Sequence, residues 1–286
     1  MKASKIAYNI MPFKKYLFYV IRKIYCPKFY AKLNFNGIFK IKFDDVYFKI
    51  THYGYYIEND LFWKGIGNGW EGTSIKLWKK LCEKANFIVD IGANTGIYAL
   101  IAKASNNSAN VYAFEPIERT YIKLAENAKI NKFNIKCINK AVSNYDGVGV
   151  IYDSKVGNIY SVTVNKNLYP TNILYPVTIQ TIKLDTFMIE EQLEKIDLIK
   201  IDVETHEIEV LEGFQEQIKK FQPTLLIEIL TEEVANGVEK ILEKYNYLYF
   251  NICENVSIKL VTKIKASNSF NYLICKDSVA RELHLI

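Results

Sequence analysis

The distribution of apolar and polar positions along the chain predicts strands that alternate with helices. Short apolar runs rich in Val, Ile, Leu and Phe are typical of strands covered on both faces. Such runs occupy Phe87–Val89, Asn110–Glu115, Ile135–Asn139, Ile196–Val203 and Thr224–Ile229. After the first run, apolar residues recur at helical spacing, at Ile97, Leu100, Ile101 and Ala104. This alternation predicts an α/β fold built on a mostly parallel sheet.

Apolar–polar alternation predicts a second kind of strand elsewhere in the chain. The alternating or antiparallel segments are residues 35–42, 46–51, 148–152, 177–183, 247–252 and 271–275. The first two are expected to form a hairpin around Asp44, and the last two an antiparallel pair. The middle two belong to a β insertion at residues 146–184, whose polar loop, residues 157–176, is expected to cover the substrate. We therefore predict an N-terminal extension of residues 1–71 and a main domain of residues 72–286.

The first 43 residues are basic and contain one amphipathic segment. They hold ten Lys or Arg and no Asp or Glu, so their charge is +10, while the whole chain carries +6 and the remainder −4. Phe13, Leu17, Val20 and Ile24 recur at helical spacing with lysines between them. We expect this helix to pack its apolar stripe on the body of the protein. The alternative is that residues 11–25 contact an anionic membrane surface.

Composition and motif content exclude several classes of protein. The five cysteines are scattered and no pair has C-x-x-C spacing, which favours reduced thiols over a disulfide framework or a zinc site. No apolar run approaches the ~20 residues needed to span a bilayer, and no signal-peptide pattern is evident. No nucleic-acid-binding motif is found either, so no nucleic-acid partner is expected. We expect a cytoplasmic protein, with peripheral contact at the inner face of the membrane as the alternative. The sequence does not specify an oligomeric state.

The turn that follows the first buried strand is the most informative part of the sequence. Asp90 ends the strand, and Gly92 and Gly96 punctuate the turn before the next helix. Glycine is favoured where φ is positive or where a ligand approaches the backbone closely, because it has no Cβ. A dinucleotide site would show G-x-G-x-x-G and would not set a carboxylate against a pyrophosphate. An acidic strand end suits a cationic or zwitterionic ligand, and the stretch is similar to the first motif of class I S-adenosylmethionine (SAM) methyltransferases.

A second carboxylate stands at the end of the next strand. Glu115 follows Gly92 by 23 residues, where nucleotide-binding folds place an acidic residue against the ribose. A carboxylate suits this position because it accepts hydrogen bonds from both hydroxyls of a vicinal diol. We therefore predict a SAM site that includes Asp90, Gly92, Ala93, Asn94, Thr95, Gly96, Glu115 and Pro116.

A third group of polar residues follows the fourth buried strand. Asp202, Glu204 and His206 come at the carboxyl edge of the sheet, where ligands bind in open α/β folds. A hydroxyl acceptor must lose its proton during methyl transfer, so we expect Glu204 or His206 to act as the base and Asp202 to orient substrate and cofactor. The D-x-E-x-H run is also an alternative ligand set for Mg²⁺ or Mn²⁺, although we predict no metal. The next strand ends near Glu228, which we expect at the same edge.

Residues 53–71 are rich in aromatic residues, glycine and asparagine and are expected to form a long loop. Loops of this kind frequently carry binding residues. With Glu228, the residues expected to contact the substrate are Tyr56, Trp63, Trp70 and Glu71.

The motifs taken together resemble a known family. VDIGANTG, VYAFEP, TIKLDTF, IDLIKIDVETHEIEVLEGF and QPTLLIEI occur in the order of the FkbM-type methyltransferases, over roughly residues 60–250. The resemblance implies a Rossmann-like class I methyltransferase fold with a seven-stranded sheet and helices on both faces, extended here by an N-terminal helix and hairpin. It also implies a loop at Lys140 and Ala141 that closes over the adenine. Thr205 stands where the family often has glycine, so the loop backbone and the choice of substrate are expected to differ.

The resemblance also implies an activity, the transfer of a methyl group from SAM to an oxygen. Our leading hypothesis is O-methylation of a sugar hydroxyl in a glycan or in a nucleotide- or lipid-linked glycan precursor, with the basic N-terminal extension favouring an anionic carrier. The alternatives are a non-sugar metabolite, a phosphoryl or amine acceptor, a nicotinamide-dependent oxidoreductase, and a SAM-binding module without turnover.

Overall fold

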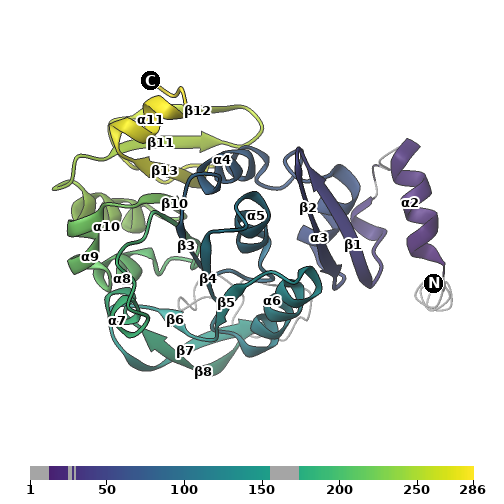
Figure 1. Cartoon of the computed structure of the whole chain (residues 1–286), viewed down its shortest axis with the longest axis horizontal. Coiled ribbons are helices and arrows are strands. Elements are labelled where there is room, and N and C mark those ends of the chain that lie inside the picture. The colour runs from purple at the N-terminus through teal and green to yellow at the C-terminus, as the bar shows by residue number, and fades with distance from the viewer. Residues whose placement is uncertain (1–12, 25–27, 29, 155–173) are drawn as a thin grey trace.

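The computed structural model describes residues 13–24, 28, 30–154 and 174–286 (Figure 1). Its central sheet has eight strands in the order β12-β11-β13-β10-β9-β3-β4-β5. The parallel strands are β3 (Phe87–Ile91), β4 (Asn110–Phe114), β5 (Ile135–Ile138), β9 (Leu198–Ile201) and β10 (Thr224–Glu228). β13 (Asn271–Cys275) runs antiparallel to both of its neighbours, β10 and β11 (Leu248–Cys253), so β11 runs in the same direction as the parallel strands. The edge strand β12 (Ser257–Val261) runs antiparallel to β11. This strand order confirms the predicted Rossmann-like fold and the antiparallel pairing of the last two predicted strands.

The sheet differs from the prediction by one strand. We expected seven strands, but β12 pairs with β11 as an additional edge strand. Its residues are half-buried or exposed, without the regular alternation of a strand that has one buried face. The sequence signal for this strand is therefore weak, and its pairing depends on the free edge that β11 offers.

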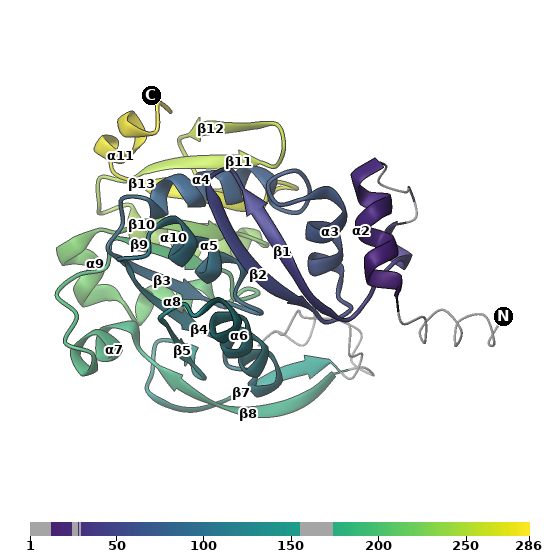
Figure 2. The same ribbon diagram turned by 45° about the vertical axis from the view of Figure 1, so that its right-hand side comes forward.

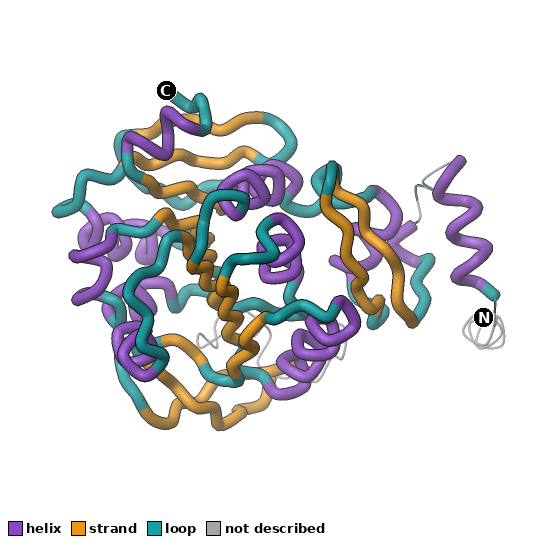
Figure 3. The backbone as a smooth tube through the Cα atoms, in the orientation of Figure 1, coloured by secondary structure: helices purple, strands orange, loops and turns teal. Residues whose placement is uncertain are grey.

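Helices cover both faces of the sheet because successive strand residues point to opposite sides. Ile88 packs in one hydrophobic core, and the adjacent Val89 packs in the other. One face is covered by α4 (Gly72–Cys82), α5 (Ile97–Ser105), α6 (Glu118–Asn131) and α11 (Asp277–Glu282). The opposite face is covered by α7 (Leu184–Glu190), α8 (Glu207–Glu212), α9 (Gln215–Phe221) and α10 (Glu232–Leu242). Figure 3 shows the strands passing between these two groups of helices.

The N-terminal hairpin forms as predicted, from β1 (Gly37–Phe43) and β2 (Val46–His52). Alternate residues of both strands, including Phe39 and Ile50, are buried in the same core as α4 and α5. The edge of β2 also bonds to α6, because the backbone N–H of Thr51 donates to Asn127 Oδ1 at 3.0 Å.

We had expected residues 53–71 to form one long loop, but they contain a helix. After a short 3₁₀ turn at Tyr30–Lys32, the chain forms the hairpin and then α3 (Tyr56–Lys64), whose Leu61, Phe62 and Trp63 are buried. Six consecutive residues of α3 are buried, polar ones included, so the helix has no clear apolar stripe. The periodicity that identifies a surface helix was therefore missing from the sequence.

The first described helix, α2 (Lys14–Ile24), forms as predicted but packs with a different face. We expected Phe13, Leu17, Val20 and Ile24 to lie against the body, but all four are exposed. Phe18 is buried instead, with its ring centroid 5.4 Å from that of Trp63. The helix turns this face inward because the body presents aromatic rings there, and a ring pair adds attraction beyond burial alone.

The two predicted strands of the insertion form, and they join a strand that was not predicted and that precedes residue 146 in a separate three-stranded sheet below the main one (Figure 1). It consists of β6 (Ala141–Val142), β7 (Gly147–Ser154) and β8 (Leu174–Ile182). Residues 157–173 of the loop expected to cover the substrate lie outside the described residues, and its last three residues, 174–176, belong to β8 instead. None of the helices in the described part of the chain combines the length and apolarity of a bilayer-spanning segment.

Candidate active site

A cavity of about 320 Å³ opens at the carboxyl edge of β3, β4, β9 and β10. This is the edge at which parallel α/β sheets bind ligands. The predicted site residues that line it are Trp70, Glu71, Asp90, Gly92, Ala93, Asn94, Thr95, Glu115, Pro116, Lys140, Ala141, Asp202, Glu204, His206 and Glu228. Segments more than 150 residues apart in the sequence therefore meet around one cavity.

The glycine turn after β3 is shaped by close approach of the next loop. Gly92 has φ +79°, and a Cβ at this position would collide with the carbonyl oxygen of Asp202. Gly96 has φ +93°, and a Cβ there would collide with Leu124. Gly96 is not among the residues that line the cavity; it shapes the start of α5. The two glycines therefore act through the backbone. Gly92 lets the loop that carries Asp202 approach closely, and Gly96 adopts the left-handed conformation that begins α5.

Glu115 holds this turn in place. Its carboxylate accepts hydrogen bonds from the backbone N–H groups of Asn94 at 3.0 Å and Ile117 at 2.9 Å. Burial raises the pKa of Glu115 to about 7, although the two backbone bonds oppose the shift. Each carboxylate oxygen has a further lone pair that can accept from a ligand hydroxyl.

The turn also presents an unused acceptor. Asn94 Oδ1 is buried without a hydrogen-bond partner among the described residues, and Asn94 lines the cavity. Buried polar atoms are rarely left unpaired, so a ligand donor is expected at this position. An unpartnered amide oxygen beside a ribose-type carboxylate fits a nucleoside-containing cofactor such as SAM.

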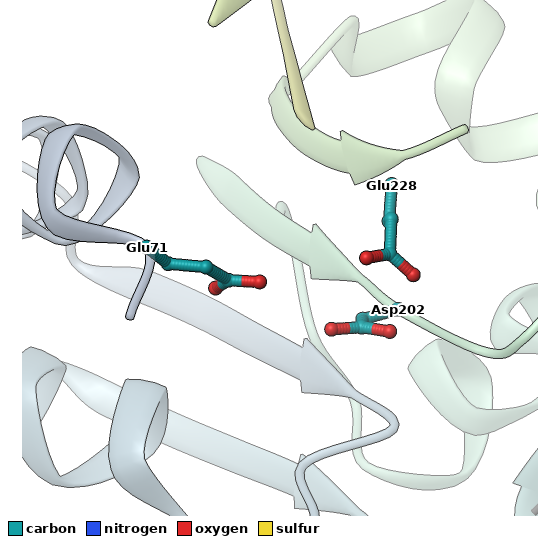
Figure 4. Close-up of side chains that lie close together, drawn as sticks. All are labelled: Glu71, Asp202 and Glu228. Atoms are coloured by element: carbon teal, nitrogen blue, oxygen red, sulfur yellow. The ribbon is translucent and has the colours of Figure 1, made fainter. Parts of the chain in front are cut away.

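Three carboxylates converge in the part of the cavity beyond the glycine turn (Figure 4). Oxygens of Glu71, Asp202 and Glu228 lie within 4.8 Å of one another. Glu71 precedes α4, while Asp202 and Glu228 come from the ends of β9 and β10, and all three are half-buried. We call this group the acidic recess. Among the described residues, the ligand atoms of this group lie close enough together to share an ion. The side chains of Asp202, Glu204 and His206, the alternative ligand set from the sequence, do not form such a group.

Lys200 supplies the positive charge of the acidic recess. Its side chain is 1% exposed, and its ammonium lies 3.3 Å from Asp202 Oδ2. It also lies 5.0 Å from the ring centroid of Tyr98 and pairs in register with Asp90 across β3 and β9. Burial lowers the pKa of Lys200, but Asp202 and Glu71 outweigh burial and leave the pKa above its ordinary value.

The carboxyl groups around Lys200 bind protons more tightly than free side chains do. Burial raises the pKa of Glu71 and of Asp90 to about 7, with the charge of Lys200 opposing the shift in both. Burial, reinforced by the charge of Asp202, raises the pKa of Glu228 to about 10. Glu228 is therefore protonated at neutral pH and can donate a hydrogen bond into the recess.

The loop between β9 and α8 brings Glu204 and His206 to the cavity wall. Glu204 has φ +53° and Thr205 has φ +80°, so the position where the family often has glycine does adopt a left-handed backbone. The Nε2 atom of His206 lies 3.0 Å from Ser143 Oγ, and its Nδ1 atom lies 3.3 Å from Glu209 Oε2. Burial lowers the pKa of His206, so the imidazole is neutral at pH 7 and able to take up a proton.

Two residues predicted to contact the substrate do not reach the cavity. Trp63 is buried in the core against Phe18 and Phe62, and its Nε1–H donates to the carbonyl of Leu33 at 3.0 Å. Tyr56 is exposed at the start of α3 and does not line the cavity. The helix that we had not predicted explains both, since it turns Trp63 inward and Tyr56 outward.

Lys200 and Tyr98 line the cavity and were missed in the sequence. Lys200 had a usable signal, because a lysine in the middle of the apolar run IDLIKIDV must be buried with carboxylate partners. Tyr98 had none, since an aromatic residue in the first turn of a helix is ordinary. Its hydroxyl donates to Glu71 Oε2 and thereby fixes that carboxylate in the recess.

The strand order and the position of the cavity place the protein among the class I SAM-dependent methyltransferases, in which the cofactor lies across the ends of the first two strands. Sequence comparison identifies the family. The methyltransferase FkbM domain matches residues 90–249, more than half of the chain, and the chain belongs to this family.

Named relatives agree with this assignment. The hexuronic acid methyltransferase AglP of Haloferax volcanii is 26% identical over 174 residues, which cover 61% of this chain and 68% of AglP. The methyltransferase sdnD of Sordaria araneosa is 28% identical over 158 residues, 46% of this chain and 61% of sdnD. A solved FkbM methyltransferase from Methylobacillus flagellatus KT has 14% identity and a TM-score of 0.42, over 66% of this chain and 43% of that one. The fold assignment rests on the strand order rather than on this last similarity.

Proposed function

We propose that the protein transfers a methyl group from SAM to a hydroxyl of a sugar, in a glycan or in a nucleotide- or lipid-linked glycan precursor. The observation that carries this proposal is the acidic recess, where Glu71, Asp202 and Glu228 converge beside the cofactor turn. Carboxyl groups bind sugars well because they accept and donate hydrogen bonds to neighbouring hydroxyls. The relative AglP, a hexuronic acid methyltransferase by name, supports a sugar as the acceptor, whereas the choice of a hydroxyl as the reacting group rests on the charge of the recess.

The charge of the recess favours a neutral hydroxyl over a carboxylate as the reacting group. Lys200 is the buried cation there, and it faces Glu71, Asp90, Asp202 and Glu228. A substrate carboxylate would add another negative charge at short range in a half-buried site, where such repulsion is strong. An anionic carrier on the acceptor must therefore lie outside the recess.

The residues that line the cavity would bind the cofactor, orient the acceptor and remove its proton. SAM, when bound, supplies a methyl group already activated by its sulfonium, so the protein has to align the acceptor and remove its proton. Asn94 and Glu115 would hold the nucleoside, and protonated Glu228 would donate a hydrogen bond to the sugar. Asp202, kept beside Lys200, would orient the acceptor. Neutral His206 or Glu204 would accept the hydroxyl proton from the wall of the cavity.

Titration calorimetry followed by a transfer assay tests this proposal. S-adenosylhomocysteine should bind and NAD should not, and label from methyl-labelled SAM should appear on neutral sugar acceptors but not on matched uronic acids. Replacement of the base, Glu204→Gln or His206→Gln, should lower kcat by about 10²-fold or more while cofactor binding persists. Methylation of the uronic acid in preference to the neutral sugar, or full activity in both variants, would contradict the proposal.

A further inference from the structure

Helix α2 is anchored to the protein through one of its faces. Phe18 packs its ring 5.4 Å from Trp63, and Tyr19 packs edge-on at 5.2 Å from Phe62. The guanidinium carbon of Arg22 lies 4.6 Å from the ring centroid of Phe62. These contacts with α3 fix the rotation of the helix about its axis. The opposite face consequently points away from the body, at the edge of the molecule in both views (Figures 1 and 2).

That outward face is apolar. Its large side chains are between 46% and 83% exposed, and they are Phe13, Tyr16, Leu17, Val20 and Ile24. Single exposed apolar residues are normal on protein surfaces, but four along one side of an eleven-residue helix, together with Phe13 just before it, form a contiguous patch. We call this patch the outer stripe. It adds nothing to the core, so burial on folding does not explain it.

Lysines border the outer stripe. At about 100° of rotation per residue, Lys23 falls on one side of the stripe, beyond Tyr16, and Lys14 falls on the other side, beyond Leu17. Helix α2 contains no acidic residue. The chain up to residue 43 holds ten Lys or Arg and no Asp or Glu, and Lys40 and Lys42 are exposed on the neighbouring β1. An apolar stripe between basic margins is the arrangement of helices that lie in the surface of an anionic bilayer.

We propose that α2 docks the protein on an anionic lipid surface, with its axis parallel to the membrane and the outer stripe inserted among the lipid headgroups. The basic margins would lie at the level of the lipid phosphates, where each cation is attracted by the surface potential. A nucleic acid would engage the lysines but leave the apolar stripe in water. A second copy of the chain would bury the stripe but set the two basic margins against each other.

The docking helix and the cavity share one structural element. Helix α3, on which α2 packs, also carries Ile57, which lines the cavity. Helix α3 therefore connects the docking helix to the wall of the cavity. This inference concerns the docking surface alone and does not depend on the identity of the methyl acceptor.

Vesicle co-sedimentation of the full chain tests the proposal. The protein should sediment with vesicles of phosphatidylcholine and phosphatidylglycerol, less with phosphatidylcholine alone, and less as salt is raised. The double variant Leu17→Gln, Val20→Gln should bind about tenfold more weakly or worse, because two inserted side chains are lost. The matched control Ile189→Gln, at an apolar residue 72% exposed on α7, should bind like the wild type. Thermal melting checks that each variant is folded.

Three results would overturn the proposal. The first is absence of binding to anionic vesicles by the wild type. The second is unchanged binding by the double variant at Leu17 and Val20. The third is a different occupant of the outer stripe. Light scattering would then show a dimer, or the protein would be retained on single-stranded RNA, and the double variant would abolish that association but leave vesicle binding unaffected.

Discussion

Removal of the buried ammonium of Lys200 is expected to destabilise the protein in a way that depends on pH. The change is Lys200→Met, which keeps the length of the side chain and removes its charge. Lys200 is 1% exposed and lies 3.3 Å from Asp202 Oδ2, with Glu71, Asp90 and Glu228 also acting on it. At this distance and an effective dielectric constant of about 20, the attraction to Asp202 alone is about 5 kcal/mol.

Part of that attraction is offset because the wild type must desolvate the ammonium. Removing one partner of a buried ion pair typically costs about 3–5 kcal/mol, since the other charge is left uncompensated. We therefore expect the free energy of unfolding of Lys200→Met to fall by about 3 kcal/mol at pH 8. At about 2 °C or more per kcal/mol for a chain of this size, Tm should fall by about 6 °C or more.

The sign of the pH effect follows from proton binding. Without Lys200 the pKa values of Glu71, Asp90 and Glu228 in the native state rise further above those in the unfolded state. The native variant then binds more protons than its unfolded chain, so its stability falls as pH rises. The difference from the wild type should therefore be smaller at pH 6 than at pH 8, as measured by thermal or denaturant unfolding at each pH.

A surface ion pair provides the matched control. Lys195 is 44% exposed, and its ammonium lies 2.9 Å from Asp197 Oδ1. Both residues directly precede β9, the strand that carries Lys200, but they lie outside the recess. Solvent screens this pair, so Lys195→Met should cost less than about 1 kcal/mol and show little pH dependence. If Lys200→Met lost no more stability than Lys195→Met at pH 8, the view of Lys200 as the counter-charge of the acidic recess would be wrong.

Three further predictions concern individual residues of the cavity. Glu115→Ala should weaken S-adenosylhomocysteine binding by about 1–3 kcal/mol in calorimetry, because ligand and loop hydrogen bonds are lost; an unchanged Kd, equal to that of the Glu118→Ala control, would refute this. Thr205→Gly should change the unfolding free energy by less than about 1 kcal/mol, since relief of the φ +80° conformation offsets the entropy gained by the unfolded chain. A large destabilisation on chemical unfolding would show that the threonine side chain has another role. Glu228→Gln should keep most of the turnover at pH 7, because the native carboxyl is already protonated there, whereas Glu228→Ala should lose it; equal loss in both variants would mean that the ionised form is required.

The sequence was most informative where chemistry is local. The end of the strand that carries Asp90, the turn at Gly92 and the carboxylate at Glu115 are each specified by residues within a short segment, and the structure places all three at the cavity. Their spacing is set by one strand–helix–strand unit, so their proximity follows from the fold class. Helix α3 and strand β12 were missed because neither shows regular periodicity: one is buried nearly all round and the other is an exposed edge.

By itself, then, the sequence determined the parallel strands of the sheet, the cofactor turn and the family of this protein, because repeating patterns and adjacent residues encode them. Only the tertiary structure decided that Glu71, Asp202 and Glu228 form one recess around Lys200, since the three carboxylates come from three elements that approach through packing rather than through spacing. It also decided which face of α2 is buried. Both faces of that helix carry apolar side chains, and the aromatic rings that the body offers to Phe18 and Tyr19 select between them.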